Sequence, residues 1–495
     1  MTDLPAAAPG PTTIGSGRTR ALGRLFPAGL AVLLAGALRV WYLLSPRMQF
    51  NADEATTGIM VREILAGRPY VFYAGQDYGG ALEQYLEAAA YLVLRLPQNA
   101  FTLRLPLVAL CMATCALTYL VAGRLFDDPV RPVLAAVLYA VGPWFNLIGS
   151  VTSLGFYAAG QFLAVAAVYC ALRRQWALTG LVAGLGIWTS PTALYVLLPV
   201  LGWLLPDLGR DRRRWGRLAA GTAVGAAPLL GWLALHRTLP IPPDPTEDST
   251  IPQRLANLVE PVLRQYVGVT YSHAEGGLWL PLQVLAVLAL AAGYLMAVLR
   301  RTRVRGRRPA DLLLAVPPVV VVLYVLSNST WYTGTPRYLL VTYPLLAIGV
   351  AALVRRLLPA VAVVTLSAVL CAGFFARLPT APSPAERDRA LVAVADLLAA
   401  EGQPYVYANY WTATPLQYAA GDRLVVATVG GVTRFPRAQR AVDAAARPVF
   451  VGSGLDGSTE RIRTALNRRN VPYRERAVDD LTVFDRLPGR VDLGL

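Results

Sequence analysis

The sequence predicts a mainly α-helical, polytopic bundle that crosses a membrane about eleven times and ends in a small extracytoplasmic α/β domain. Of the 495 residues, 55% are hydrophobic, and the mean hydropathy is +0.46, which is typical of a chain that has lipid as its solvent. Apolar stretches close to the roughly 20 residues that a helix needs to cross a bilayer recur between residues 26 and 375. Beyond residue 385, short apolar runs alternate with helical patterns.

The N-terminal tail, residues 1–25, is rich in Pro, Gly, Thr and Arg, and we expect it in the cytoplasm. The apolar segment that follows has no Ala-x-Ala cleavage motif, so we expect a retained helix and not a signal peptide. The predicted spans are residues 26–44, 103–125, 133–149, 154–172, 177–190, 192–205, 218–235, 278–299, 312–326, 338–354 and 357–375.

The segment 81–96 is apolar but carries Glu83, Glu87 and Arg95. If it does not cross the membrane, the later Arg-rich connections fall on the same side as the N-terminal tail; if it crosses, they fall on the opposite side. Cytoplasmic loops are enriched in Lys and Arg, so we expect an amphipathic helix at the outer interface. The connections concerned are residues 124–131, 173–174, 210–217, 300–308 and 355–356.

The transmembrane domain, residues 26–376, is therefore expected to have outer loops at about 45–102, 237–277 and 327–336. The second loop is rich in Pro and carboxylates and contains His273; the third contains Trp331, Tyr332 and Thr333. An odd number of spans places the C-terminal domain outside. The abundance of Ala, Gly, Pro and Arg suggests a bacterial genome, so the expected location is the bacterial cytoplasmic membrane.

The C-terminal domain, residues 385–495, follows a Pro-rich linker. Its apolar runs predict strands, its longer patterns predict helices between them, and its Gly430-Gly431 and Gly452-Ser453-Gly454 segments are expected to be turns. The predicted strands are near residues 405–407, 424–428, 448–451 and 481–484, and the predicted helices are near residues 386–400, 436–446 and 458–469.

Charge and cysteine content exclude two classes of function. The net charge of +16 falls largely in the Arg blocks between apolar segments, so it indicates membrane orientation and not nucleic-acid binding. All four cysteines lie in apolar runs without a neighbouring His, so we expect core residues and not a metal or redox site: Cys111, Cys115, Cys170 and Cys371. We expect no cofactor.

The adjacent carboxylates Asp53 and Glu54 directly follow the first span. Carboxylates close to a bilayer are costly unless they are paired or used. Asp53 could be the N-cap of a helix over residues 54–65, or a general base that faces a lipid-linked substrate. The two interpretations are compatible.

The segment 72–80 that follows combines glycines with hydroxyl and carboxylate side chains. Glycines allow close backbone approach, tyrosines stack on sugar rings, and the polar groups can bind hydroxyls. The residues expected to bind a carbohydrate are Tyr73, Gln76, Asp77, Tyr78 and Glu83. The alternative is an ordinary interfacial turn with an aromatic belt.

Two arginines lie where a charge needs a partner. Arg39 is inside the first span, so we expect it either to extend to the interface or to pair with an outer-loop carboxylate or a lipid phosphate. Arg337, next to Tyr338 at the outer start of the tenth span, is suited to hold a phosphate through forked hydrogen bonds.

Over residues 25–375 the chain resembles the membrane-embedded GT-C glycosyltransferases, in the branch of the protein O-mannosyltransferases and the lipid A aminoarabinose transferases. The resemblance rests on the Asp53-Glu54 pair at the end of the first span, the Gly- and Tyr-rich run 73–80 with Leu82-Glu83, the Leu103-Arg104-Leu105-Pro106 start of the second span, and Pro336-Arg337-Tyr338-Leu339-Leu340 with Tyr343-Pro344.

The resemblance implies inverting transfer of a sugar from a polyprenyl-phosphate carrier to a glycan, lipid or protein acceptor on the outer face. Asp53 would be the general base, Glu54 would orient the acceptor or support that base, and Arg337 with Tyr338 would contact the donor. Arg39 is a further candidate donor ligand. The branch implies no metal, and the C-terminal domain, which is less typical of these relatives, leaves the acceptor open.

Two other functions remain open from the sequence. A transporter or flippase of polyprenyl-linked sugars would be expected to show a repeated half-structure and polar residues at the midplane, and the sequence shows neither. A non-catalytic envelope assembly protein would use the outer domain to bind a partner, with the Asp53-Glu54 pair merely structural.

Overall fold

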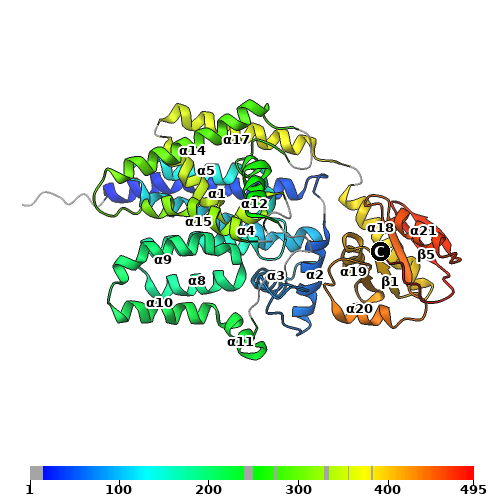
Figure 1. The fold of residues 1–495 in the computed structure, drawn as a ribbon. Coiled ribbons are helices and arrows are strands. Elements are labelled where there is room, and N and C mark those ends of the chain that lie inside the picture. The colour runs from blue at the N-terminus through cyan, green and yellow to red at the C-terminus, as the bar shows by residue number, and fades with distance from the viewer. Residues whose placement is uncertain are drawn as a thin grey trace, which may run out of the picture.

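The computed structural model describes residues 15–48, 50–238, 249–271, 276–327, 330, 334–354, 356–380 and 383–494. It consists of a helical bundle and an α/β domain at one end of it, beside helix α2 (Figure 1). The predictions for the Pro-rich part of the second outer loop, His273, and Trp331 to Thr333 lie outside the described residues.

Each of the eleven predicted spans coincides with a helix or a broken helix. Within the described ranges, six helical segments are long and apolar enough to cross a membrane, or seven if a pair bent by 70° counts as one. The six contain α1 (Gly15–Leu43), α4 (Ala100–Leu125), η1 (Pro191–Ala193) with α9 (Leu194–Leu208), α14 (Leu280–Thr302), η3 (Pro336–Thr342) with α16 (Tyr343–Leu353), and α17 (Leu357–Arg377). The bent pair is α10 (Arg212–Gly225) and α11 (Ala227–His236).

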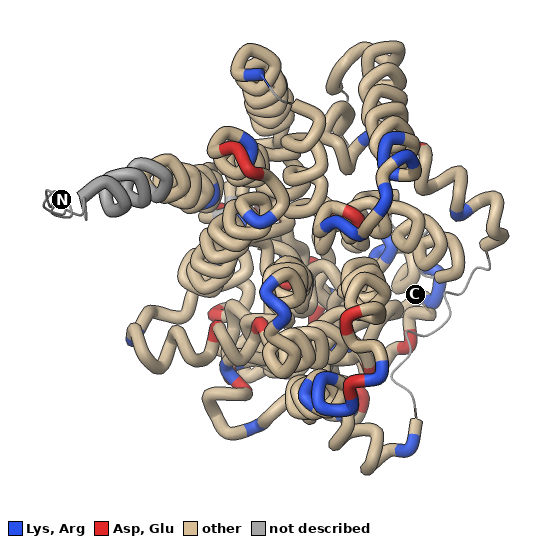
Figure 2. Tube along the Cα trace, turned by 90° about the vertical axis from the view of Figure 1, so that its left-hand side faces the viewer, with Lys and Arg blue, Asp and Glu red and all other residues tan. Residues whose placement is uncertain are grey.

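Four further apolar helices are shorter than a full span: α5 (Val130–Val141), α7 (Tyr157–Leu172), α8 (Trp176–Thr189) and α15 (Asp311–Leu326). The short α6 (Trp144–Gly149), α12 (Ile251–Asn257), η2 (Leu258–Leu263) and α13 (Arg264–Tyr266) complete the bundle. Eleven crossings therefore stay a prediction, while the helical character of each segment is observed. Charged residues are sparse along the long helices of the bundle (Figure 2).

Helices α8 and α10 pack with their backbones in close contact through glycines. A Cβ atom on Gly180 would lie 2.0 Å from the Leu218 carbonyl oxygen, and one on Gly221 would lie 2.1 Å from the Ala177 carbonyl oxygen. Small residues at four-residue spacing allow this approach between membrane helices.

The first outer loop folds into α2 (Ala52–Leu65) and α3 (Leu82–Leu94), joined by a turn that includes a β-bridge between Phe72 and Gly80. Asn51, and not Asp53, is the N-cap of α2: its side chain accepts a hydrogen bond from the Glu54 N–H, and the Glu54 side chain accepts one from the Asn51 N–H. The prediction that Asp53 caps this helix is therefore wrong. Asp53 is the second residue of α2, and its side chain takes no part in the capping box.

The C-terminal domain is a five-stranded sheet with helices on both faces. The strand order is β2-β1-β3-β5-β4, in which β1 pairs in parallel with β2 and β3, and β5 pairs antiparallel with β3 and β4. The strands are β1 (Tyr405–Ala408), β2 (Val425–Thr428), β3 (Val449–Ser453), β4 (Arg474–Val478) and β5 (Leu481–Asp485). The helices are α18 (Pro384–Ala400), α19 (Tyr410–Ala420), η4 (Gly421–Arg423), α20 (Pro436–Asp443) and α21 (Ser458–Arg468).

The alternation of side chains along β1 accounts for the two helical layers. Val406 and Ala408 belong to a buried cluster with α18 and α19, whereas Tyr407 belongs to a second cluster with α20 and α21. Successive residues of a strand point to opposite faces, so each face of the sheet is covered by one pair of helices.

Candidate functional site

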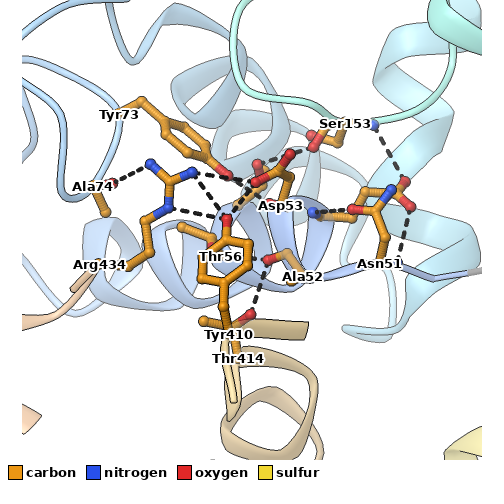
Figure 3. A network of polar contacts seen from close by, with 12 residues as sticks. Asn51, Ala52, Asp53, Thr56, Tyr73, Ala74, Ser153, Tyr410, Thr414 and Arg434 are labelled. Carbon is orange, nitrogen blue, oxygen red and sulfur yellow. Dashed lines mark hydrogen bonds and ion pairs between the residues drawn. The ribbon is translucent and has the colours of Figure 1, made fainter. Parts of the chain in front are cut away.

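Asp53 lies at the junction between the bundle and the C-terminal domain. Its side chain is 13% exposed and pairs with two arginines: Arg337 Nη2 is 3.4 Å from Oδ2, and Arg434 Nη2 is 3.3 Å from Oδ1. The hydroxyl of Tyr410 also donates to Oδ1 (Figure 3). One carboxylate thus joins η3 of the bundle to two segments of the C-terminal domain.

The turn before α3 also contacts this junction. The Tyr73 hydroxyl donates to the Asp53 carbonyl at 2.6 Å, and the Arg434 guanidinium lies 5.1 Å from the Tyr73 ring centroid. Arg434 Nη1 also donates to the Ala74 carbonyl at 3.3 Å. At Gly75, where φ is +71°, a Cβ atom would lie 2.7 Å from the Arg434 Cα. Glycine there allows both the turn and the close approach of the C-terminal domain.

The two tyrosine hydroxyls at Asp53 stay protonated as donors. Burial, followed by the negative charge of Asp53, raises the pKa of Tyr410 well above its usual value. The same two causes raise the pKa of the fully buried Tyr73. Tyr78, half-buried and packed edge-on against Phe156, also has its pKa raised by burial.

Glu54, the next residue of α2, has partners within the bundle. Its carboxylate is fully buried and makes a bidentate ion pair with Arg104 of α4, with Nε–Oε1 and Nη2–Oε2 distances of 2.6 and 2.7 Å. The Ser153 N–H donates to the same carboxylate at 3.2 Å. The two adjacent acids therefore have different surroundings: Asp53 lies between the two parts of the protein, and Glu54 fixes α2 to the bundle.

Glu83 is also a buried residue and does not face the surface. Its Oε1 accepts a hydrogen bond from the Ala159 N–H at 2.8 Å, in the first turn of α7, where backbone N–H groups lack intrahelical partners. Burial raises the pKa of Glu83 to about 7, although the Ala159 and Ala158 N–H groups lower it. The expectation that Glu83 binds a sugar hydroxyl conflicts with this position, because the carboxylate has 0% exposure.

The other residues of the expected carbohydrate site differ in their exposure and in their distance from Asp53. Gln76 is partly buried, and its Oε1 atom is enclosed without a hydrogen-bond partner among the described residues. Asp77 is exposed. Of these residues, Tyr73 contacts Asp53, through its hydroxyl and the Asp53 backbone carbonyl. Tyr78 packs against Phe156, and Glu83 accepts a hydrogen bond in the first turn of α7.

Arg39 contacts no carboxylate among the residues that the structure describes, and it does not extend to the interface. It is fully buried, and its guanidinium donates to the Ala140 carbonyl, to the Tyr139 carbonyl at 3.5 Å, and to Ser150 Oγ at 3.2 Å. The last carbonyls of a helix lack intrahelical partners, and both carbonyls lie in the last turn of α5. Arg39 therefore caps α5 from within the bundle, through hydrogen bonds to two backbone carbonyls and one hydroxyl.

Arg337 lies in η3 with its side chain 31% exposed. Its guanidinium is 5.8 Å from the Tyr157 ring centroid, and Tyr338 beside it is half-buried. Arg337 is thus close to Asp53 and partly accessible, as a ligand of a charged substrate must be.

The sequence did not identify Arg434 and Tyr410. Tyr410 follows the end of β1, and Arg434 lies in the connection after β2. Because β1 and β2 are parallel neighbours, both residues come from the carboxyl edge of the sheet, where ligands usually bind in open α/β sheets. A position just after a predicted strand was therefore the one sequence signal for these two residues. Using it required the knowledge that β1 and β2 are parallel neighbours.

A groove of about 840 Å³ opens beside this junction. Both parts of the protein line it, with Arg62, Arg68 and Tyr70 on the bundle side and Arg434, Phe435 and Arg437 on the other. Within the described part of the chain, no three His, Cys, Asp or Glu side chains gather as a metal site would require.

Comparison with known proteins agrees with this architecture. Residues 86–232 match the family described as dolichyl-phosphate-mannose-protein mannosyltransferase; this range contains neither Asp53 nor the residues that contact its side chain. No curated protein sequence matches the chain.

Solved structures match over nearly the whole chain. ArnT from Cupriavidus metallidurans, bound to undecaprenyl phosphate, is 14% identical, with 92% of this chain and 98% of that chain covered and a TM-score of 0.59. The archaeal oligosaccharyltransferase AglB from Archaeoglobus fulgidus, in complex with an inhibitory peptide and a dolichol-phosphate, is 12% identical, with 94% and 74% covered and a TM-score of 0.56. The chain therefore has the fold of these GT-C glycosyltransferases, and its residues 86–232 match a mannosyltransferase family in sequence.

Proposed function

We propose that this protein is an inverting glycosyltransferase that moves a sugar from a polyprenyl-phosphate donor to an acceptor hydroxyl on the outer face of the membrane. The observation that carries the proposal is the pairing of Asp53 with Arg337 at 3.4 Å. A carboxylate and a guanidinium thus lie side by side where the bundle meets the C-terminal domain, and this supports an assignment of the first as base and of the second as phosphate ligand. Structures with this fold that hold undecaprenyl phosphate or a dolichol-phosphate support the class of donor.

The chemistry needs few groups. The acceptor O–H bond breaks and its proton moves to the Asp53 carboxylate, the acceptor oxygen bonds to the anomeric carbon, and the bond from that carbon to the phosphate oxygen breaks. The electron pair leaves with the polyprenyl phosphate, which gains one negative charge. Arg337 is suited to stabilise that charge.

A single accessible carboxylate fits this reaction better than hydrolysis of a glycoside. A sugar phosphate already has a good leaving group, so one base is sufficient. Glycosidases use two carboxylates on either side of the bond, one of which protonates a poor leaving group. Glu54 does not fill that second role, because its carboxylate is buried in the pair with Arg104.

The function can be tested by following the carrier. The protein is reconstituted in lipid vesicles with a set of polyprenyl-phosphate sugars and a crude extract of envelope glycans and lipids. We expect free polyprenyl phosphate to appear in equal amount to the transferred sugar. A transporter would move the donor across the bilayer and leave it intact, and an assembly protein would do neither; either result contradicts the proposal.

Replacing Arg337 by Ala is expected to weaken donor binding. A hydrogen bond to a charged group contributes about 1.5–3 kcal/mol, so we expect the KM for the donor to rise roughly 10- to 100-fold. The matched control is Arg437→Ala, which removes an arginine of the C-terminal domain that lines the groove. If donor KM and donor binding are the same in Arg337→Ala and the wild type, Arg337 does not hold the phosphate.

A further inference from the structure

The C-terminal domain is fixed to the same turn of α2 that carries Asp53. Thr414 Oγ1 of α19 donates to the Ala52 carbonyl at 3.0 Å. At Gly58, one and a half turns further along α2, an added Cβ atom would lie 2.3 Å from the Tyr418 ring, so the two helices are in direct contact. Arg62 donates to the Tyr418 carbonyl at 2.7 Å and stacks on its ring at 4.1 Å. These contacts hold α19 against α2 along the two turns of α19 that follow Tyr410.

The two oxygens of Asp53 have different partners. Oδ1 accepts from the Tyr410 hydroxyl and from Arg434 Nη2, and Arg434 itself donates to the Tyr410 oxygen from Nε at 3.1 Å and from Nη2 at 2.9 Å. Oδ2 contacts Arg337, at 3.4 Å. Arg434 is 8% exposed, whereas the Arg337 side chain is 31% exposed. Oδ1 is thus held by a closed group from the C-terminal domain, and Oδ2 is held by a more accessible arginine of the bundle.

We propose that Tyr410 and Arg434 are positioning residues, through which the C-terminal domain anchors Oδ1 of Asp53 so that Oδ2 is the atom that takes the acceptor's proton. This inference rests on the proposed function. When the carrier phosphate binds Arg337, that arginine leaves Oδ2, and a lone pair becomes available for the acceptor hydroxyl. Tyr410 and Arg434 remain on Oδ1 and keep the carboxylate from rotating. The C-terminal domain is then part of the catalytic site and not an appended binding module.

The proposed arrangement predicts how the pH–rate profile changes when Tyr410 or Arg434 is replaced. The titratable and charged groups that surround Asp53 are Tyr73 and Tyr78 from the first outer loop, Tyr157 of α7, Arg337 of η3, Tyr410 of α19 and Arg434. A carboxylate that loses a hydrogen-bond donor or a cation holds its proton more tightly. Removing Tyr410 or Arg434 should therefore move the acid limb of the pH–rate profile to higher pH.

The test uses the 495-residue chain in vesicles with the donor that the function assay identifies. The variants are Tyr410→Phe, which removes one hydroxyl, and Arg434→Lys and Arg434→Ala. The controls are Tyr418→Phe, on the same helix and at the same interface, and Arg437→Lys, three residues beyond Arg434. We expect kcat to fall about tenfold in Tyr410→Phe, as for one hydrogen bond to a charged group, with the donor KM unchanged and the acid limb shifted upward. Arg434→Ala should lose more, and Arg434→Lys should recover part of that loss.

The thermal unfolding midpoint of each variant separates positioning from folding. Tyr410→Phe should lower the midpoint by no more than the loss of one hydrogen bond to a charged group, so that the variant stays folded at the assay temperature and its lower kcat reports positioning. The inference is overturned if the wild type transfers sugar and Tyr410→Phe and Arg434→Lys have the same kcat and the same acid limb of the pH–rate profile as the two controls. It is equally overturned if these variants are faster than the wild type, because the pair would then block Asp53. Failure of the proposed function is distinct, since the wild type itself would release no polyprenyl phosphate.

Discussion

Asp53→Asn is expected to abolish sugar transfer in a protein that still folds. Asn has nearly the same size as Asp and retains a side-chain oxygen that can accept from Tyr410 and Arg434. Its amide, however, cannot take a proton from a hydroxyl. General-base catalysis contributes about 10²- to 10⁴-fold, so we expect kcat to fall by at least this range, with the donor KM little changed.

The matched control is Asp422→Asn, which neutralises an exposed carboxylate of the C-terminal domain. Release of polyprenyl phosphate measures transfer, and the thermal midpoint in detergent measures folding. An Asp53→Asn protein with near wild-type transfer would show that Asp53 is not the base. A large drop in the midpoint would instead show that the carboxylate mainly holds the two parts of the protein together.

Breaking the Glu54–Arg104 pair is expected to destabilise the protein strongly. Both side chains are buried, at 0% and 4% exposure. Removing one partner of such a buried pair breaks both of its charge-assisted hydrogen bonds, at a cost of about 3–5 kcal/mol. We therefore expect Glu54→Gln and Arg104→Met each to lower the thermal midpoint markedly, and the double variant Glu54→Gln/Arg104→Met to cost less than the sum of the two.

The same variants test the chemical role that the sequence suggests for Glu54. If the pair is structural, transfer per folded molecule in Glu54→Gln stays close to the wild-type rate while the yield of folded protein falls. A Glu54→Gln protein that keeps the wild-type midpoint but transfers slowly would instead show that Glu54 acts in the reaction. The double variant supports the structural interpretation only if it recovers stability and activity together.

The N-cap of α2 could have been identified from the sequence, although the prediction chose the wrong residue. Asn51 and Asp53 are both good N-cap residues. The capping box requires Glu or Gln three positions after the cap, and Glu54 meets this condition for Asn51. Local sequence therefore contained the answer for this helix boundary.

Two elements of the C-terminal domain escape sequence patterns for identifiable reasons. Helix α19 contains Pro415, Thr412 and Thr414, which are poor formers of an isolated helix, and its packing against α2 and the sheet stabilises it. Strand β4 carries the charged run Arg474-Glu475-Arg476 at the edge of the sheet, where Arg474 and Arg476 pair with Asp485 of β5. In both cases tertiary contacts decide the structure.

The sequence by itself determined the apolar helices of the bundle, the α/β character of the C-terminal domain and the candidacy of Asp53, because each depends on local periodicity and composition. The tertiary structure decided which of the two adjacent acids is accessible and which polar groups are buried as caps, as with Arg39 on α5 and Glu83 on α7. It also decided that Tyr410 and Arg434 meet Asp53, across 357 and 381 positions of the chain. No periodicity reports such contacts, because they arise only when the carboxyl edge of a folded sheet packs against the first turn of α2.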